Sequence, residues 1–134
     1  MGLRVAMRAD ASTVMGAGHV SRCLTIAEAI VARGGRVPVS DLAHGAWLGT
    51  SQAADARDVV AALGDGVWDW MVVDHYALDA RWQGAVRTAV PRMLAVDDLA
   101  DRRQDVEVLL DQNLPGDPER YRPQGPARCR LLLG

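Results

Sequence analysis

The alternation of short apolar runs with segments of helical periodicity most constrains what this chain can fold into. Apolar residues at three- and four-residue steps predict helices over 20–31, 53–64 and 80–89, each followed closely by glycine or proline. Between and around them, short apolar runs predict strands at residues 3–7, 68–74, 92–98, 106–112 and 129–134. Strands that alternate with helices form parallel sheets covered on both faces, so the sequence predicts an α/β, Rossmann-like fold.

One stretch of the chain departs from this regular alternation. Residues 36–40 are apolar enough for a further strand, but Pro38 favours an edge position or a short strand. Residues 41–51 carry no clear period, and the segment 115–126 is rich in proline and glycine. The sheet is therefore expected to be compressed or shortened around residues 36–51.

Length and charge exclude several classes of protein. The chain has 134 residues, which predicts one domain, and its formal net charge of -2 gives no electrostatic case for a nucleic-acid or membrane partner. There is no apolar run of about 18 residues and no signal-peptide pattern, so a cytoplasmic location is expected. Two cysteines and three histidines without ligand spacing predict no disulfide framework, no metal and no cofactor.

Polar residues follow the predicted strands directly. They are Arg8 and Asp10, then Asp74, His75 and Tyr76, then Asp97 and Asp98, then Asp111, Gln112 and Asn113. Since ligands of open α/β sheets bind outside the carboxyl ends of the strands, these residues are predicted to collect at one edge as a binding site. His75 is then either a group that faces the ligand or one that is hydrogen-bonded to a neighbour.

The turn containing Gly16, Gly18 and His19 allows several interpretations. A phosphate-binding P-loop is excluded because no lysine follows the glycines. A dinucleotide fingerprint needs glycine where Ser21 stands, although Asp41 lies near the distance expected of a ribose-binding acid. A third interpretation is that the glycines let a pyrophosphate approach the helix N-terminus. There the helix dipole disfavours a protonated His19, which would leave a neutral imidazole to take a proton from water; the simpler alternative is a surface histidine.

Five blocks, in order, carry a resemblance to a known family: "RADASTVMGAGHVSRCLTIAEAI", "DWMVVDHYALD", "LAVDDLADR", "DVEVLLDQNL" and "CRLLLG". With them the chain resembles the N-terminal half of the bacterial UDP-2,4-diacetamido-2,4,6-trideoxy-β-L-altropyranose hydrolases of pseudaminic acid biosynthesis, and of the related spore coat polysaccharide biosynthesis proteins. Those proteins are similar to two-domain GT-B glycosyltransferases, whose active site lies between two Rossmann-like halves. The resemblance implies a nucleotide-sugar hydrolase that releases UDP and free sugar with inversion.

The resemblance also implies roles for single residues. His19 would be the catalytic base that activates water, in a turn made with Gly16 and Gly18. The implied substrate-binding residues are Arg8, Asp10, Gly16, Gly18, Asp74, His75, Tyr76, Asp97 and Asp98. Among these, Asp10 is an alternative cap of the glycine turn, and one of Asp97 and Asp98 is an alternative loop-holding residue.

Residues 1–134 match only the half that supplies the base, so a single N-terminal domain without the C-terminal UDP-binding domain is expected. The partners implied are the UDP-sugar and that second domain, and the isolated piece is expected to be slow or inactive because remote UDP contacts help to position the reacting carbon. Three alternatives stay open: the N-terminal domain of a GT-B glycosyltransferase, a non-catalytic nucleotide-binding module, and a degenerate domain kept for assembly.

Overall fold

A computed structural model of the chain describes residues 2–9, 18–34, 48 and 50–134. Its elements, in chain order, are β1 (Val5–Ala9), α1 (Gly18–Val31), α2 (Gln52–Leu63), β2 (Trp70–Asp74), α3 (Ala80–Val86), β3 (Met93–Val96), β4 (Val108–Asp111), α4 (Pro118–Tyr121) and β5 (Arg130–Leu133). The strands form one five-stranded sheet in the order β1-β2-β3-β4-β5, and every neighbouring pair is parallel. The predicted parallel α/β architecture is confirmed at this level.

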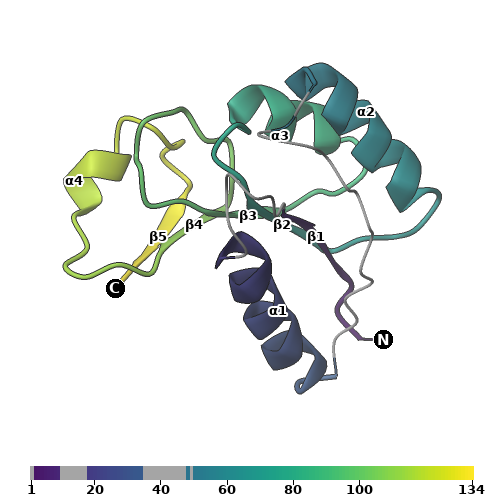
Figure 1. The fold of residues 1–134 in the computed structure, drawn as a ribbon, viewed down its shortest axis with the longest axis horizontal. Coiled ribbons are helices and arrows are strands. Elements are labelled where there is room, and N and C mark those ends of the chain that lie inside the picture. Colours follow the sequence, from purple (N-terminus) through teal and green to yellow (C-terminus); the bar gives the residue numbers. More distant parts are fainter. Residues whose placement is uncertain (1, 10–17, 35–47, 49) are drawn as a thin grey trace.

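The helices lie on both faces of the sheet (Figure 1). Helices α2 and α3 cover one face, where Trp82 and Val86 pack with Met71 and Met93 in the larger hydrophobic core. Helix α1 lies on the opposite face and contributes Cys23 to a smaller core. Both faces of the central strands are therefore removed from water, which explains why the sequence of β2 is apolar at consecutive positions before Asp74.

Local sequence explains where the covering helices begin and end. Ser51 caps α2 by accepting a hydrogen bond from the backbone N–H of Ala54, and Gly64 follows the helix with a φ of 57° that favours glycine. Asp79 caps α3 in the same way, accepting from the N–H of Arg81. These caps fix α2 and α3 against the sheet, and the start of α3 lies just beyond the carboxyl end of β2.

Most element boundaries differ from the sequence-based ones by one to three residues; α3, for example, ends at Val86 rather than at residue 89, and β3 ends at Val96 rather than at residue 98. Strand β1 runs to Ala9 rather than ending at residue 7, because its parallel register with β2 continues through the pairs Arg8 with Val73 and Ala9 with Asp74. Helix α1 begins at Gly18, two residues earlier than predicted. The short helix α4 was not predicted, because its period is too brief to detect in a segment rich in proline and glycine. The predicted strand at 36–40 lies outside the described residues.

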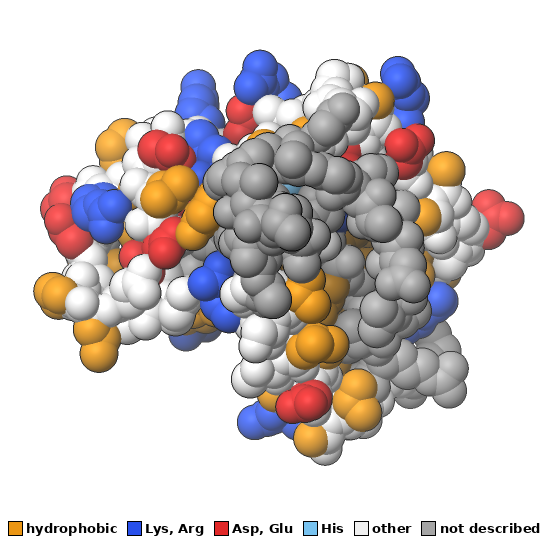
Figure 2. Space-filling view, viewed as in Figure 1, with side chains coloured by type: hydrophobic (Ala, Val, Ile, Leu, Met, Phe, Trp, Pro, Cys, Tyr) orange, Lys and Arg blue, Asp and Glu red, His pale blue; other side chains and the backbone are white. Residues whose placement is uncertain are grey.

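Exposed hydrophobic side chains are found on α1, where Leu24 and Val31 are each about half exposed (Figure 2). Among the helices of the described segments, none has the length and apolar character needed to span a membrane.

Candidate functional site

The carboxyl end of β2 joins helix α1 through an ion pair. Asp74, the last residue of β2, is fully buried, and Arg22 of α1 donates to it from Nε at 3.0 Å and from Nη2 at 3.1 Å. Two parallel bonds fix the orientation of the guanidinium as well as its distance. Arg22 keeps 30% of its side chain exposed, and the hydrogen bond to Asp74 raises its pKa. The pair thus places a charged guanidinium at the sheet edge.

A second set of hydrogen bonds runs across the ends of three neighbouring strands. The hydroxyl of Tyr76, just after β2, donates to Oδ1 of Asp98 at 2.8 Å. Nδ2 of Asn113, just after β4, donates to Oδ2 of the same carboxylate at 3.1 Å. We call Tyr76, Asp98 and Asn113 the edge relay. The strand order brings its members together, because β3, which precedes Asp98, lies between β2 and β4.

The relay sets the charge state of its members. Burial raises the pKa of the Tyr76 hydroxyl, and the hydrogen bond to Asp98 raises it further, against a smaller opposing effect of Arg22. Burial alone would raise the pKa of Asp98, but the hydrogen bonds from Tyr76 and Asn113 outweigh it and lower that pKa below 3.8. At neutral pH the relay therefore holds a neutral phenol against an ionised carboxylate.

Asp97 and Asp98 are adjacent in sequence but have different surroundings. Asp97 is buried, forms an ion pair with Nη1 of Arg102 at 2.8 Å, and accepts from the backbone N–H of Ala100. Arg102 also donates to the backbone oxygen of Leu78, so this pair ties the loop after β2 to the loop after β3. Of the two residues, Asp97 has the contacts of a loop-holding residue and Asp98 those of a surface group.

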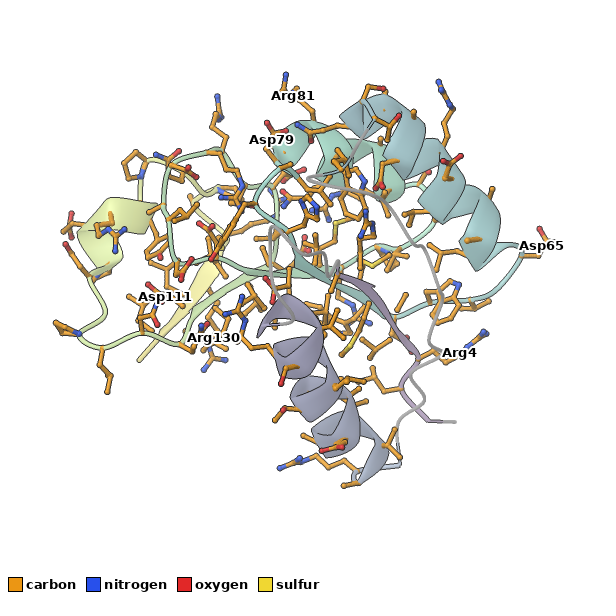
Figure 3. The ribbon with its side chains drawn as sticks, viewed as in Figure 1. Arg4, Asp65, Asp79, Arg81, Asp111 and Arg130 are labelled. Atoms are coloured by element: carbon orange, nitrogen blue, oxygen red, sulfur yellow. The ribbon has the colours of Figure 1, made fainter. Side chains whose placement is uncertain are left out.

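The carboxylate that ends β4 is also engaged inside the protein. Asp111 is buried and accepts from the hydroxyl of Tyr121 at 2.7 Å and from the backbone N–H of Asn113 at 2.9 Å. Tyr121 belongs to α4, so this contact docks the short helix on the end of β4. Figure 3 labels Asp111 at this end of the strand.

His75 directly follows Asp74 at the end of β2, and its side chain is buried. Its Nδ1 accepts a hydrogen bond from the backbone N–H of Ala77 at 3.0 Å. An accepting Nδ1 belongs to the tautomer that carries its proton on Nε2. The sequence left open whether His75 faces a ligand or is hydrogen-bonded to a neighbour. At Nδ1 the structure shows the second arrangement, with Ala77 as the neighbour.

Arg8 lies within β1 and points to the face that carries α2. Its Nη2 is 2.8 Å from Oδ1 of Asp55, and the side chains are 1% and 0% exposed. The other oxygen of Asp55 accepts from Nε1 of Trp82 at 2.7 Å. This buried cluster joins β1, α2 and α3. The substrate-binding role of Arg8 stays a prediction, and the contact that the structure shows for Arg8 is the ion pair with Asp55 inside the protein.

The predicted catalytic turn is described only in part. His19 is the second residue of α1, one helical turn before Arg22. Gly18 begins the helix and is exposed, and a Cβ added there would meet no described atom within 4 Å. Asp10, Gly16 and Asp41 lie outside the described residues, so their predicted roles stay predictions.

Sequence reasoning did not assign Arg22 to the site, and it placed Asn113 at the sheet edge without giving it a role. The signal for Arg22 was its place three residues after His19, which puts the two positions on one side of a helix. The signal for Asn113 was its place directly after a strand, which the prediction noted without giving the residue a role.

A separate hollow lies on the flank of α3. It is lined by Asp79, Ala80, Arg81, Arg102, Arg103, Gln104, Asp105 and Pro126. Two of these residues, Asp79 and Arg81, form an ion pair of 2.7 Å and lie side by side in Figure 3. Arg102 and Asp105 instead pair with residues outside the lining, and Arg102 also lies over the ring of Tyr76, which connects the hollow to the edge relay. None of the predicted site residues that the structure describes lines the hollow. In the described part of the chain, no three histidine, cysteine or acidic side chains are grouped to hold a metal ion.

Comparison of the chain with models of known protein families gave no match, and no curated protein matches its sequence.

Proposed function

We propose that this chain is the base-supplying domain of an inverting nucleotide-sugar hydrolase, which cleaves a UDP-linked 2,4-diacetamido-2,4,6-trideoxy sugar to UDP and the free sugar. The proposal rests on the resemblance of the five sequence blocks. The observation that carries it is the convergence of Arg22, Tyr76 and Asp98 at the carboxyl edge of a parallel sheet, where α/β proteins bind their ligands.

In this proposal His19 accepts a proton from a water molecule as that water attacks the anomeric carbon. The bond between the anomeric carbon and the β-phosphate oxygen breaks, its electron pair leaves with UDP, and the proton passes from His19 to solvent. One water is consumed for each UDP and each sugar released. Attack opposite to the leaving group inverts the configuration of the anomeric carbon.

The decisive experiment is acceptor-free release of UDP and free sugar from UDP-2,4-diacetamido-2,4,6-trideoxy-altrose. The chain is assayed alone and together with a separately made C-terminal half of a longer member of the family that it resembles. His19→Ala is expected to lower the rate by about 10²- to 10⁴-fold, the usual contribution of a positioned general base. His44 stands in the segment 41–51 without a partner residue at useful spacing, so the sequence predicts a solvated side chain outside the site. His44→Ala therefore serves as the matched control and should retain the rate.

Three outcomes would refute the proposal. They are no release by either preparation of the folded protein, equal loss in both histidine variants, and release that requires an added acceptor. The last outcome would indicate a glycosyltransferase instead.

A further inference from the structure

The carboxylates at the sheet edge differ in how far they are accessible to a ligand. Asp74 and Asp97 are buried against arginines, and Asp111 is buried beneath the hydroxyl of Tyr121. Asp98 pairs with no arginine side chain among the described residues, and its side chain is partly exposed. Asp98 is therefore the carboxylate of this edge that keeps its charge accessible.

The hydrogen bonds of the edge relay fix which atoms a ligand would meet. A phenol has one proton, and Tyr76 donates its proton in a hydrogen bond to Asp98, so Tyr76 has no second proton to donate to a ligand; its oxygen also interacts with the guanidinium of Arg22. An ionised carboxylate cannot donate, so the amide nitrogen of Asn113 must face Asp98, which leaves the amide oxygen as a further acceptor. The carboxylate itself has about four acceptor positions, and the relay occupies two of them.

The ionised carboxylate of Asp98 accepts hydrogen bonds from N–H and O–H groups and repels the oxygens of a phosphate. The guanidinium of Arg22, which interacts with Tyr76 and lies near Asp98, instead attracts phosphate oxygens. Because its proton is engaged with Asp98, Tyr76 supplies none to a leaving group while Asp98 is ionised. A nucleotide sugar would therefore lie with N–H or O–H groups of its sugar, and not its diphosphate, against Asp98.

We propose, on the basis of the function proposed above, that Asp98 is a specificity-determining residue that accepts a hydrogen bond from an acetamido N–H or a hydroxyl of the sugar. Tyr76 and Asn113 are its positioning residues, since each holds one oxygen of the carboxylate from a neighbouring strand end.

The test compares Asp98→Asn and Asn113→Ala with Asp65→Asn. Asp65 is exposed and lies between α2 and β2, at the opposite end of β2 from the edge relay (Figure 3), so it controls for a change of carboxylate to amide outside the predicted site. The assay uses the chain with the C-terminal half and measures KM and kcat for the UDP-sugar, together with the Kd of the UDP-sugar and of UDP alone.

Asp98→Asn is expected to raise the KM and the Kd of the UDP-sugar about ten-fold or more, as expected for loss of a hydrogen bond to a charged group, while the Kd of UDP stays unchanged. Asn113→Ala should give a smaller rise in the same two quantities, and Asp65→Asn none. An unchanged KM and Kd in Asp98→Asn would overturn the inference, as would an equal loss of UDP affinity, which marks a merely structural role.

The same measurements separate this inference from the proposed function. If the unaltered protein binds the UDP-sugar without releasing UDP, the hydrolase proposal fails, whereas a Kd that still depends on Asp98 supports sugar recognition. If UDP release is normal and indifferent to Asp98, the hydrolase proposal stands and the recognition inference fails. Absence of any UDP-sugar binding overturns both.

Discussion

Replacing Asp55 with alanine is expected to lower the free energy of unfolding by about 3–5 kcal/mol, because the change breaks a buried ion pair by removing one partner. The guanidinium of Arg8 stays at 1% exposure and loses the carboxylate that lies 2.8 Å from it. The indole N–H of Trp82, also fully buried, loses its acceptor at 2.7 Å. An unsatisfied buried donor alone costs about 1–3 kcal/mol, and the two effects overlap rather than add.

Urea unfolding followed by the fluorescence of the tryptophans measures this loss. A 3 kcal/mol change divided by a slope of about 1.5 kcal/mol per molar urea moves the midpoint by about 2 M. Asp58→Ala is the matched control, since Asp58 lies one turn further along α2 and is exposed, so its replacement should change stability by less than about 0.5 kcal/mol.

Because domains of this size are stable by only about 5–15 kcal/mol, the alanine variant could fail to fold, and Asp55→Asn keeps the experiment interpretable. Asparagine retains one oxygen, which can accept from Trp82, and places an amide N–H₂ where Asp55 presents an oxygen to Arg8. It should lie between the wild-type protein and Asp55→Ala in stability. A loss below about 1 kcal/mol in both variants would refute the interpretation of the cluster as a buried structural contact.

Two further predictions concern ionisation. The hydrogen bonds that lower the pKa of Asp98 below 3.8 stabilise the folded state above that pH, and this contribution is lost as the pH falls from 3.8 through the lowered pKa. The stability difference between the wild-type protein and Asp98→Asn, measured by urea unfolding, should therefore shrink below pH 4; a constant difference down to pH 3 would contradict this. Burial raises the pKa of the Cys23 thiol to about 12, so at pH 8 a disulfide reagent should modify the less buried Cys129 first in the folded protein. Equal rates for the two cysteines, resolved by mass spectrometry of peptides, would contradict it.

The sequence predicted the layered fold well because burial of parallel strands leaves a strong pattern. Strand β2 has four consecutive buried residues, and such a run can be recognised without knowledge of its neighbours. The ends of a strand depend on its hydrogen bonds with the neighbouring strand. Strand β1 extends through Arg8 because β2 continues beside it and because the charge of Arg8 is compensated by the carboxylate of Asp55. A partner 47 residues away cannot be read from the local pattern of β1.

The candidate site was predictable in its position and not in its detail. The rule that ligands meet the carboxyl ends of strands identified Asp74, Tyr76 and Asp98, and hydrogen bonds or ion pairs engage each of them at that edge. Which of two adjacent aspartates faces outward was undetermined, because both follow the last residue of β3 and their directions depend on loop contacts with Arg102 and Tyr76. Those partners come from other loops, so tertiary structure alone distinguishes the two carboxylates.

The buried carboxylates at the edge make the site depend on residues that a ligand would not touch. Arg22 is held by Asp74, and α4 is held by Asp111 through Tyr121. The contact between Arg22 and Asp74 fixes the start of α1, and the contact between Tyr121 and Asp111 fixes α4 beside the end of β4, which precedes Asn113 of the relay. Loss of one should therefore disturb binding geometry and stability together, whereas loss of Asp98, which is partly exposed, should affect recognition with a smaller loss of stability at neutral pH. This contrast gives a way to separate scaffold from binding surface: a residue of the surface changes the affinity for the sugar strongly and shifts the unfolding midpoint only a little.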